Sequence, residues 1–354
     1  MQTIVITGGH HNSALVVAKE LVSRGVKVIW IGHRYSSRGD THDSAEYIEV
    51  TSASIPFHAL SAGKLVPNIK DLFRFPLGII YAIKILKQFR PSAILSFGGY
   101  LGGTVALAGK LLGTPIYLHE QTVTAGRANK LIGKLAKQIY LTWGESAKYF
   151  PPSKIKVVGL PLREGVLAAK PKTLFTRQKP TLLVMGGKQG AHIINQFIFT
   201  RLNDLLNHFN IVHQTGTSSL TLDYEHALAI QSELGSLSDS YLPLGYIGEG
   251  QIGTYLHSAD FYLGRSGAHI CYELAVVGLP ALLVPLMSTH DAEQYKNATI
   301  LVSNKQALIL PSSKLTLQNF LSHLAKLRQL TPVKQSLPTN ATTLLVNHLL
   351  SELV

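Results

Sequence analysis

Cysteine is nearly absent from this chain of 354 residues, which contains a single example, Cys271. One thiol cannot form an intrachain disulfide or a zinc site built from cysteines, so both are excluded and a reducing compartment is indicated. Long apolar runs are also missing, because the least interrupted one, 274–289, is broken by Gly278, Pro280 and Pro285. Such a run is not a membrane span. The first residues, QTIVIT, read as a strand and not as a secretory signal, so we expect a cytoplasmic protein.

Acidic residues are scarce as well. The chain has 20 Asp and Glu against 33 Lys and Arg, which gives a net charge of +13. The excess lies in residues 1–160, where 19 basic residues face 8 acidic ones, whereas residues 161–354 have 14 against 12. This asymmetry suggests an anionic partner for the first half: nucleic acid, an anionic membrane surface or a polyphosphate substrate. A basic surface that only confers solubility is an equal alternative.

Strand-like and helix-like segments alternate along the first half. The length fits two domains, and 46% hydrophobic residues are enough to form substantial cores. We expect strands at 4–7, 27–32, 93–96 and 115–119, and helices at 13–24, 81–89 and 103–112. Alternation of this kind predicts a parallel sheet covered by helices on both faces.

The same alternation restarts after residues 159–180, where prolines and charges dilute the pattern. A strand at 181–185 leads into a glycine turn and a helix from about Ala191. We therefore predict an α/β protein with two Rossmann-like domains facing a cleft. The N-terminal domain spans 1–160, the linker 161–180 and the C-terminal domain 181–354, and the last helix could pack on either domain.

Glycine-rich turns follow three predicted strands of the first half. Thr7-Gly8-Gly9-His10 follows the first strand, SFGGYLGG starts at Ser96, and LHEQTVTAGRANK starts at Leu118. Backbone N–H groups in such turns can close on a phosphate, and His10 could take a proton from a bound hydroxyl. Glycine is also common in ordinary tight turns, His10 could cap a helix, and the His119-Glu120 pair could be a buried hydrogen bond.

The second half has further polar turns. In MGGKQGA, Gly186, Gly187 and Gly190 bracket Lys188, without the spacing of a Walker A or dinucleotide loop. In RSGAHICYE, a turn of small residues leads into the N-terminus of a predicted helix, and Glu273 follows within the first two turns of that helix. Helix N-termini suit phosphates, and a carboxylate suits sugar hydroxyls.

Residues 285–298 follow the next predicted strand and are rich in polar side chains. Asp291, Glu293, Gln294 and Asn297 could bind a sugar, although a run of this kind is ordinarily a solvated helix face. His290 and Asp291 do not form a metal site, because no third ligand is close in the sequence.

A basic segment with an apolar centre occupies residues 64–91. Its centre, FPLGIIYAI, lies among Arg74, Lys84, Lys87 and Arg90. This composition is typical of a helix lying at a bilayer interface. Taken alone, the segment is better explained as an ordinary amphipathic helix that covers the sheet.

In order along the chain, these motifs resemble one family. They are similar to motifs of the bacterial peptidoglycan glycosyltransferases of the MurG family. The motifs are TGGH, SFGGY, LHEQ, Gly159-Leu160-Pro161-Leu162-Arg163, GGKQGA, RSGA with Glu273 and GLPALLVP, and EQYKNA. Those enzymes transfer N-acetylglucosamine from UDP-N-acetylglucosamine to undecaprenyl-pyrophosphoryl-N-acetylmuramoyl-pentapeptide, converting lipid I to lipid II. The resemblance covers nearly the whole chain and implies the two-domain glycosyltransferase type B fold.

The resemblance also implies roles for individual residues. His10 is the expected catalytic base, with Glu120 as the second candidate. The implied donor-binding residues are Thr7, Gly8, Gly9, Thr122, Arg163, Lys188, Ile247, Ala268, His269, Ile270, Cys271, Tyr272, Glu273 and Gln294. Among these, Glu273 would bind ribose hydroxyls, Ile247 would meet uracil and Gln294 would reach the sugar. Gly98, Gly99 and Tyr100 are the expected acceptor-binding residues.

Three departures from the family pattern are visible. The first loop is shorter than usual, Thr122 stands where the family has asparagine, and Lys188 stands where it has serine. A lysine beside a diphosphate would act as a point charge.

We expect an inverting reaction by direct displacement in peptidoglycan synthesis. No obligatory metal or other cofactor is expected, since no Asp-x-Asp pair is present. The expected partners are the lipid-linked acceptor, an anionic membrane surface and other cell-wall enzymes, but no nucleic acid. The protein is expected to be peripheral on the cytoplasmic face of the plasma membrane. The alternatives are an enzyme of the same fold with another lipid acceptor and a non-catalytic nucleotide-sugar-binding scaffold.

Overall fold

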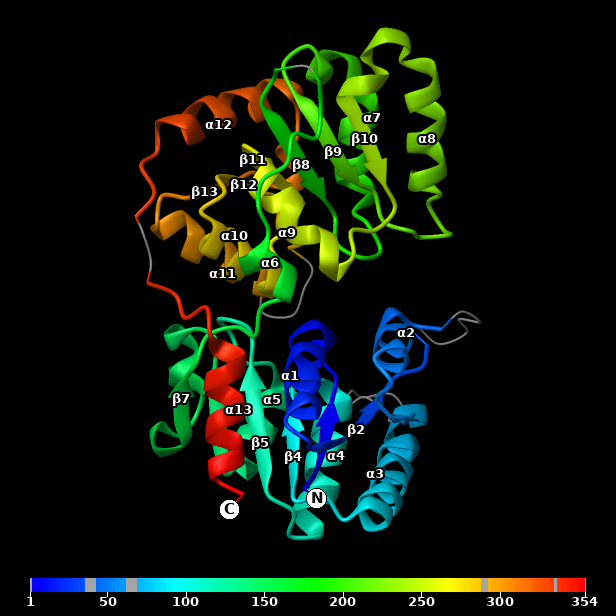
Figure 1. The fold of residues 1–354 in the computed structure, drawn as a ribbon, viewed down its shortest axis with the longest axis vertical. Coiled ribbons are helices and arrows are strands. Elements are labelled where there is room, and N and C mark those ends of the chain that lie inside the picture. Colours follow the sequence, from blue (N-terminus) through cyan, green and yellow to red (C-terminus); the bar gives the residue numbers. More distant parts are fainter. Residues whose placement is uncertain are drawn as a thin grey trace. The chain divides into compact units, whose positions relative to one another are not determined.

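The computed structural model describes residues 2–35, 43–61, 69–176, 178–287, 292–333 and 336–353. His290 and Asp291, considered above as polar groups near a sugar site, lie outside the described residues. The chain forms two compact units, one made of Met1–Leu162 with Pro338–Val354 and the other of Arg163–Leu337 (Figure 1).

A parallel sheet forms the centre of the first unit, with seven strands among the described residues in the order β3-β2-β1-β4-β5-β6-β7. The strands are β1 (Thr3–Thr7), β2 (Lys27–Gly32), β3 (Phe57–Ala59), β4 (Ala93–Ser96), β5 (Ile116–Glu120), β6 (Gln138–Leu141) and β7 (Ile155–Val157). The helices are α1 (His11–Ser23), α2 (Ala45–Ser52), α3 (Ile69–Phe89), α4 (Gly99–Leu111), α5 (Arg127–Leu135) and the C-terminal α13 (Ala341–Ser351), with 3₁₀ turns at Gly144–Tyr149 and Pro152–Lys154.

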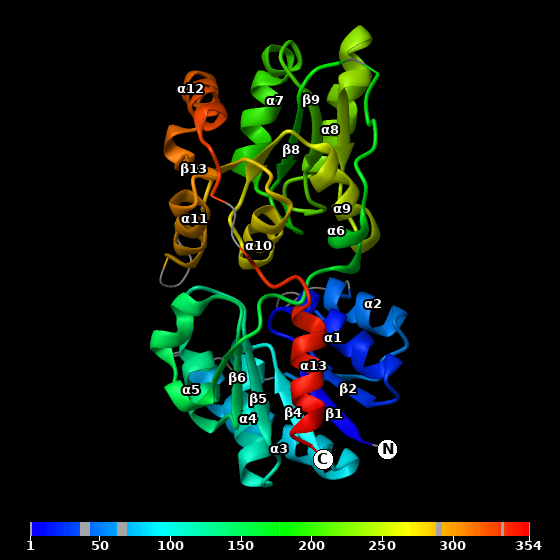
Figure 2. The same ribbon diagram turned by 60° about the vertical axis from the view of Figure 1, so that its left-hand side comes forward.

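Helices cover both faces of this sheet, and β1 shows why its residues are continuously apolar. Ile4 and Ile6 pack with α1, α2 and α13 on one face, whereas Val5 packs with α3, α4 and α5 on the other. Successive side chains of a strand point to opposite faces, so a strand covered on both sides must be apolar throughout. Figure 2 shows α13 beside α1, which it contacts although the two helices are separated by most of the chain.

The second unit repeats this architecture. Its described residues form a six-stranded parallel sheet in the order β10-β9-β8-β11-β12-β13. The strands are β8 (Thr181–Met185), β9 (Asn210–Gln214), β10 (Tyr241–Leu244), β11 (Phe261–Gly264), β12 (Ala281–Leu283) and β13 (Ala307–Ile309). The helices are α6 (Glu164–Ala168), α7 (His192–Leu206), α8 (Asp223–Glu233), α9 (Glu249–Ser258), α10 (Ala268–Val277), α11 (Glu293–Ser303) and α12 (Leu317–Gln329), with 3₁₀ turns at Gly235–Ser240 and Ser312–Lys314.

The expected α/β fold class is confirmed, with two parallel sheets of Rossmann type. Helix α3 differs most from the expectation, because it starts at Ile69 and contains Pro76, whereas only residues 81–89 were expected to be helical. Proline removes one helical N–H, yet a long amphipathic face packed on a sheet can offset that loss. Within the described part of the chain, no helix combines the length and apolarity that a membrane crossing requires.

Candidate functional site

In both sheets the strand order reverses direction at one point, and several of the candidate residues follow the strands on either side of it. In the first unit the reversal lies between β1 and β4, and in the second between β8 and β11. Chains leaving two such neighbouring strands diverge to opposite faces, which opens a crevice at the carboxyl ends of the strands. Each unit therefore has one crevice of this kind, at the carboxyl edge of its sheet.

At the edge of the first unit, two glycine loops touch backbone to backbone. A Cβ atom on Gly9 would lie 2.4 Å from the carbonyl oxygen of Gly98, so a larger residue cannot replace Gly9 without moving the chain. Gly98 and Gly99 have φ values of 86° and 78°, which favour glycine. The hydroxyl of Thr7 donates to Ser96 Oγ at 3.0 Å, which joins β1 to β4 below the loops. The structure thus places two predicted donor-binding residues, Thr7 and Gly9, and the acceptor-binding residues Gly98 and Gly99 in one cluster.

His10 occupies the N-cap position of α1 at this edge. Its ring is half-buried, and no hydrogen-bond partner for it lies among the described residues. Burial, and then the charge of His11, lowers the pKa of His10 to about 4. The imidazole is therefore neutral near pH 7 and has a lone pair available for a proton, as a general base requires.

Glu120, the second candidate base, is fully buried at the end of β5 and already engaged. One carboxylate oxygen accepts from the backbone N–H and the hydroxyl of Thr122, at 2.9 and 3.0 Å. The other accepts from Asn129 Nδ2 at 2.8 Å, and Asn129 Oδ1 in turn accepts from Gly99 N at 3.1 Å. This arrangement suits a residue that positions the 98–99 loop better than one that takes a proton from substrate.

At the edge of the second unit, α10 presents an open N-terminus. Its N-cap residue is Gly267, which has no side chain to cap the helix. The backbone oxygen of Gly267 accepts the first hydrogen bond of the helix, from Cys271 N at 3.1 Å. The N–H groups of residues 268–270 therefore have no acceptor within the helix, which favours an anion at this position. Cys271 and Tyr272 are fully buried in the core. These two predicted donor-binding residues therefore anchor α10 in the core.

Gln294, at the start of α11, lies close to the same turn. Its backbone oxygen accepts from Ser266 Oγ at 2.8 Å, and its side-chain oxygen accepts from Leu286 N at 3.0 Å. Among the described residues, no acceptor is found for the amide nitrogen of Gln294.

Glu273 is completely buried on α10 and forms a two-pronged ion pair with Arg163. Arg163 Nε donates to Oε1 at 2.7 Å and Nη2 donates to Oε2 at 2.5 Å. His269, one turn earlier on the helix, has its Nε2 3.7 Å from Oε1. Two predicted donor-binding residues that are far apart in the sequence are therefore direct partners.

Gln214 was not predicted, yet it joins the loops that carry Lys188 and Ile247. Its side chain donates to the Gly187 carbonyl at 2.9 Å and accepts from Ile247 N at 3.1 Å. Lys188 lies over the ring of Tyr246, 5.4 Å from its centroid, so this departure from the family pattern is held by a cation–π contact. The polar residues His213 and Gln214 at the end of β9 were the signal in the sequence that could have indicated it.

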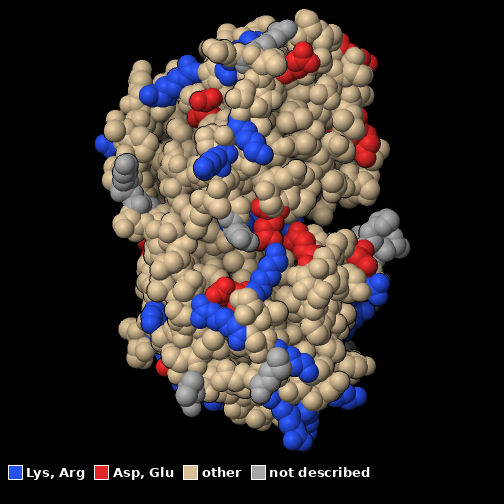
Figure 3. All heavy atoms as spheres, in the orientation of Figure 1, with Lys and Arg blue, Asp and Glu red and all other residues tan. Residues whose placement is uncertain are grey.

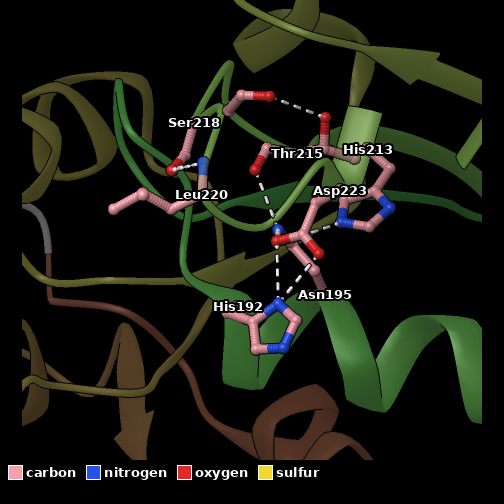
Figure 4. Close-up of polar contacts among 8 residues, drawn as sticks. His192, Asn195, His213, Thr215, Ser218, Leu220 and Asp223 are labelled. Carbon is pink, nitrogen blue, oxygen red and sulfur yellow. Dashed lines mark hydrogen bonds and ion pairs between the residues drawn. The ribbon is translucent and has the colours of Figure 1, made fainter. Parts of the chain in front are cut away.

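A polar network behind the glycine loop of the second unit was also not predicted (Figure 4). The buried carboxylate of Asp223 accepts from His192 Nδ1 at 2.8 Å and from Asn195 Nδ2 at 2.8 Å. Asn195 also donates to the Thr215 carbonyl at 2.8 Å. A Cβ atom on Gly190 would lie 2.0 Å from that carbonyl oxygen, so the network supports the strand end against which the loop rests.

Replacing Asp223 by alanine is expected to lower the free energy of unfolding by roughly 1–3 kcal/mol, because a buried amide loses its acceptor. Chemical denaturation of the variant measures this change. Asp239→Ala, at an exposed position of the same unit, is the control and should change stability little. Equal stability of the two variants would show that the Asp223 network does not support the loop.

Comparison with known proteins covers nearly the whole chain. Residues 3–141 match the glycosyltransferase family 28 N-terminal domain, and residues 181–346 match the family 28 C-terminal domain. A UDP-N-acetylglucosamine–N-acetylmuramyl-(pentapeptide) pyrophosphoryl-undecaprenol N-acetylglucosamine transferase of Staphylococcus aureus is 30% identical over 344 residues, which cover 93% of this chain and 91% of the relative. A transferase of the same name, numbered 2, from Bacillus cereus is 29% identical and covers 93% of this chain and 92% of the relative.

The fold comparison agrees. The crystal structure of Acinetobacter baumannii MurG matches with a TM-score of 0.75 and 26% sequence identity, over 99% of this chain and 100% of that one. The two matched domains correspond to the two sheets described above. The protein is therefore a glycosyltransferase of family 28 and belongs to the MurG family within it.

Proposed function

We propose that this protein transfers N-acetylglucosamine from UDP-N-acetylglucosamine to lipid-linked N-acetylmuramoyl-pentapeptide, converting lipid I to lipid II in peptidoglycan synthesis. The observation that carries the proposal is the family match over both halves of the chain, together with an open helix N-terminus beside a buried carboxylate. Neither another lipid acceptor nor a non-catalytic scaffold is favoured by the relatives, all three of which are named for the same transfer or the same family.

In the proposed donor site, each part of UDP-N-acetylglucosamine meets a matching group. The N–H groups at the start of α10 would hold the diphosphate, with Lys188 as an additional cation. Glu273 would accept from the ribose hydroxyls, Ile247 would meet the uracil and the side-chain amide of Gln294 would reach the sugar. Thr7, Gly8, Gly9 and Thr122, which belong to the first unit, stay predicted donor-binding residues.

The proposed reaction is a direct displacement. A hydroxyl oxygen of the acceptor sugar attacks the anomeric carbon of N-acetylglucosamine, and the bond from that carbon to the UDP oxygen breaks with inversion. The neutral His10 takes the hydroxyl proton, and the donors at α10 stabilise the negative charge on departing UDP. Gly98, Gly99 and Tyr100 would bind the acceptor. No metal is required in this proposal.

A radiolabelled donor assay with lipid I tests the function. We expect labelled lipid II and free UDP in equal amounts, with turnover unchanged by a chelator of divalent cations. Transfer to a diacylglycerol or dolichol-like carrier in preference to lipid I would contradict the proposed acceptor. Detection of a glycosyl-enzyme adduct by mass spectrometry would contradict direct displacement.

Helix α3 supports a further part of the proposal, attachment to an anionic membrane surface on the cytoplasmic side. Leu77, Ile80 and Tyr81 are 53%, 50% and 56% exposed and lie on one face at helical spacing. Arg74 precedes them and Lys84 follows, with its Nζ 5.5 Å from the Tyr81 ring centroid. Blue Lys and Arg atoms are spread over the part of Figure 3 that shows the first unit. Such a face combines charge attraction with shallow insertion.

Neutralising Arg74, Lys84, Lys87 and Arg90 together is expected to abolish sedimentation with anionic vesicles at low salt. Each basic residue near an anionic surface contributes about 1 kcal/mol, so four of them can decide whether the protein stays bound. UDP affinity should not change, because none of these four residues is among the predicted donor-binding residues.

The control for this variant removes the same charge elsewhere. Four exposed lysines of the second unit can be neutralised in its place, namely Lys170, Lys172, Lys314 and Lys326. If both variants lose vesicle binding equally, net charge alone explains it and α3 is not the contact face. Binding that ignores lipid charge and salt would contradict the electrostatic part of the proposal.

A further inference from the structure

The buried pair of Arg163 and Glu273 has a consequence for donor recognition. The guanidinium occupies one lone pair on each carboxylate oxygen, at 2.7 and 2.5 Å, and the carboxylate has no exposed surface. Arg163 itself is only 8% exposed. The carboxylate proposed to bind ribose is thus shielded by a cation, and ribose hydroxyls cannot reach it while the pair is closed.

The backbone around Arg163 is anchored, which limits how the pair can open. Arg163 is the N-cap of α6, and α6 lies so close to α9 that a Cβ atom on Gly253 would be 1.7 Å from the Gly165 carbonyl oxygen. Glu273 is held within α10, whose neighbouring residues Cys271 and Tyr272 are core residues. Opening is therefore confined to rotation of the Arg163 side chain.

Charge balance indicates what could draw the guanidinium away. A buried carboxylate or guanidinium left without a partner is strongly destabilising, so Arg163 needs another anion when it leaves Glu273. A nucleoside diphosphate offers hydroxyls for the carboxylate and phosphate oxygens for the guanidinium, which binds phosphate in the same two-pronged way. A nucleoside without phosphates offers only the hydroxyls.

We propose that Arg163 is a specificity-determining residue that exchanges Glu273 for the donor diphosphate, so that ribose recognition becomes available only to ligands that carry the diphosphate. The proposal rests on the donor site proposed above. In the free protein Arg163 competes with ribose for Glu273, and in the complex each of the two side chains pairs with a different part of the donor. The buried pair thereby couples two contacts that would otherwise act independently.

Arg163→Met separates the diphosphate contact of Arg163 from its competition with ribose for Glu273, because methionine is of similar length and carries no charge. Displacement of radiolabelled UDP-N-acetylglucosamine measures the affinity of UDP and of uridine for wild type and variant. UDP affinity is expected to fall by at least about tenfold, the equivalent of one charge-assisted hydrogen bond. Uridine affinity is expected to rise, because nothing then competes for Glu273. Arg163→Lys, which keeps the charge but not the two-pronged geometry, should lie between wild type and Arg163→Met for both ligands.

Opposite changes for the two ligands support the exchange. An unchanged uridine affinity would mean that Arg163 contacts only the diphosphate, and a fall for both ligands would mean that it only maintains the site, so either result overturns the proposal. Thermal denaturation identifies a misfolded methionine variant, and in that case the lysine variant alone decides, by whether its uridine affinity rises. Wild-type protein that binds neither UDP nor the labelled donor would contradict the proposed function itself.

Discussion

Replacing His10 by alanine is expected to lower kcat by roughly a hundredfold or more and to leave UDP binding nearly unchanged. The ring is neutral at the operating pH, has no described partner and lies beside the glycine loops of the first unit. Losing it removes the proton acceptor from the transition state but no donor contact. Steady-state kinetics with lipid I and calorimetry with UDP measure the two quantities.

His11→Ala is a matched control, since His11 is the adjacent residue but its Nε2 is paired with Glu49 at 3.0 Å. We expect that variant to retain turnover within a few-fold. If His10→Ala also keeps turnover within a few-fold, a water chain or Glu120 becomes the better candidate for the base.

The pH dependence gives a second measurement of the same role. Because the pKa of His10 is lowered to about 4, the basic form persists well below neutrality, and kcat/KM should stay level until the pH approaches that value. A decline that starts near pH 6.5 would show that the essential base has the ordinary pKa of a histidine and would contradict the lowered pKa of His10.

Folding must be followed alongside these kinetics. Burial also lowers the pKa values of His119 and His213, to about 4 and about 3. Below pH 6.5 the unfolded chain therefore binds more protons than the folded one, and the free energy of unfolding falls as the pH is lowered. Circular dichroism at each pH separates unfolding from protonation of the base.

Replacing Glu273 by glutamine is expected to reduce UDP affinity by at least about tenfold. A hydrogen bond to a charged group contributes about 1.5–3 kcal/mol, and the amide offers the ribose a weaker, uncharged acceptor. Glutamine is preferred to alanine because it leaves Arg163 one acceptor in the buried site. Glu225→Gln, at an exposed position of the same unit, is the control and should bind UDP as wild type does. Unchanged affinity of Glu273→Gln by calorimetry would refute the ribose assignment.

Local patterns in the sequence predicted much of the fold and the position of the candidate site. The strands Lys27–Gly32, Ala93–Ser96 and Thr181–Met185 match the expected ranges, because short apolar runs bounded by glycine or polar residues are local signals. The glycine loops were visible for the same reason, since turns depend on a few adjacent residues. The start of α3 could not be read in this way, because a proline within the helix is tolerated only through tertiary packing.

The sequence by itself determined the two α/β halves, the glycine loops at their strand ends and the family to which their order points. Tertiary structure alone decided the partners: Arg163 with Glu273, Gln214 between two loops, and Glu120 with Thr122 and Asn129. Arg163 and Glu273 are 110 residues apart, and nothing in the residues between them specifies that they meet. Hydrogen bonds of this kind depend on where packed helices and strands bring their ends, which is a property of the whole folded unit.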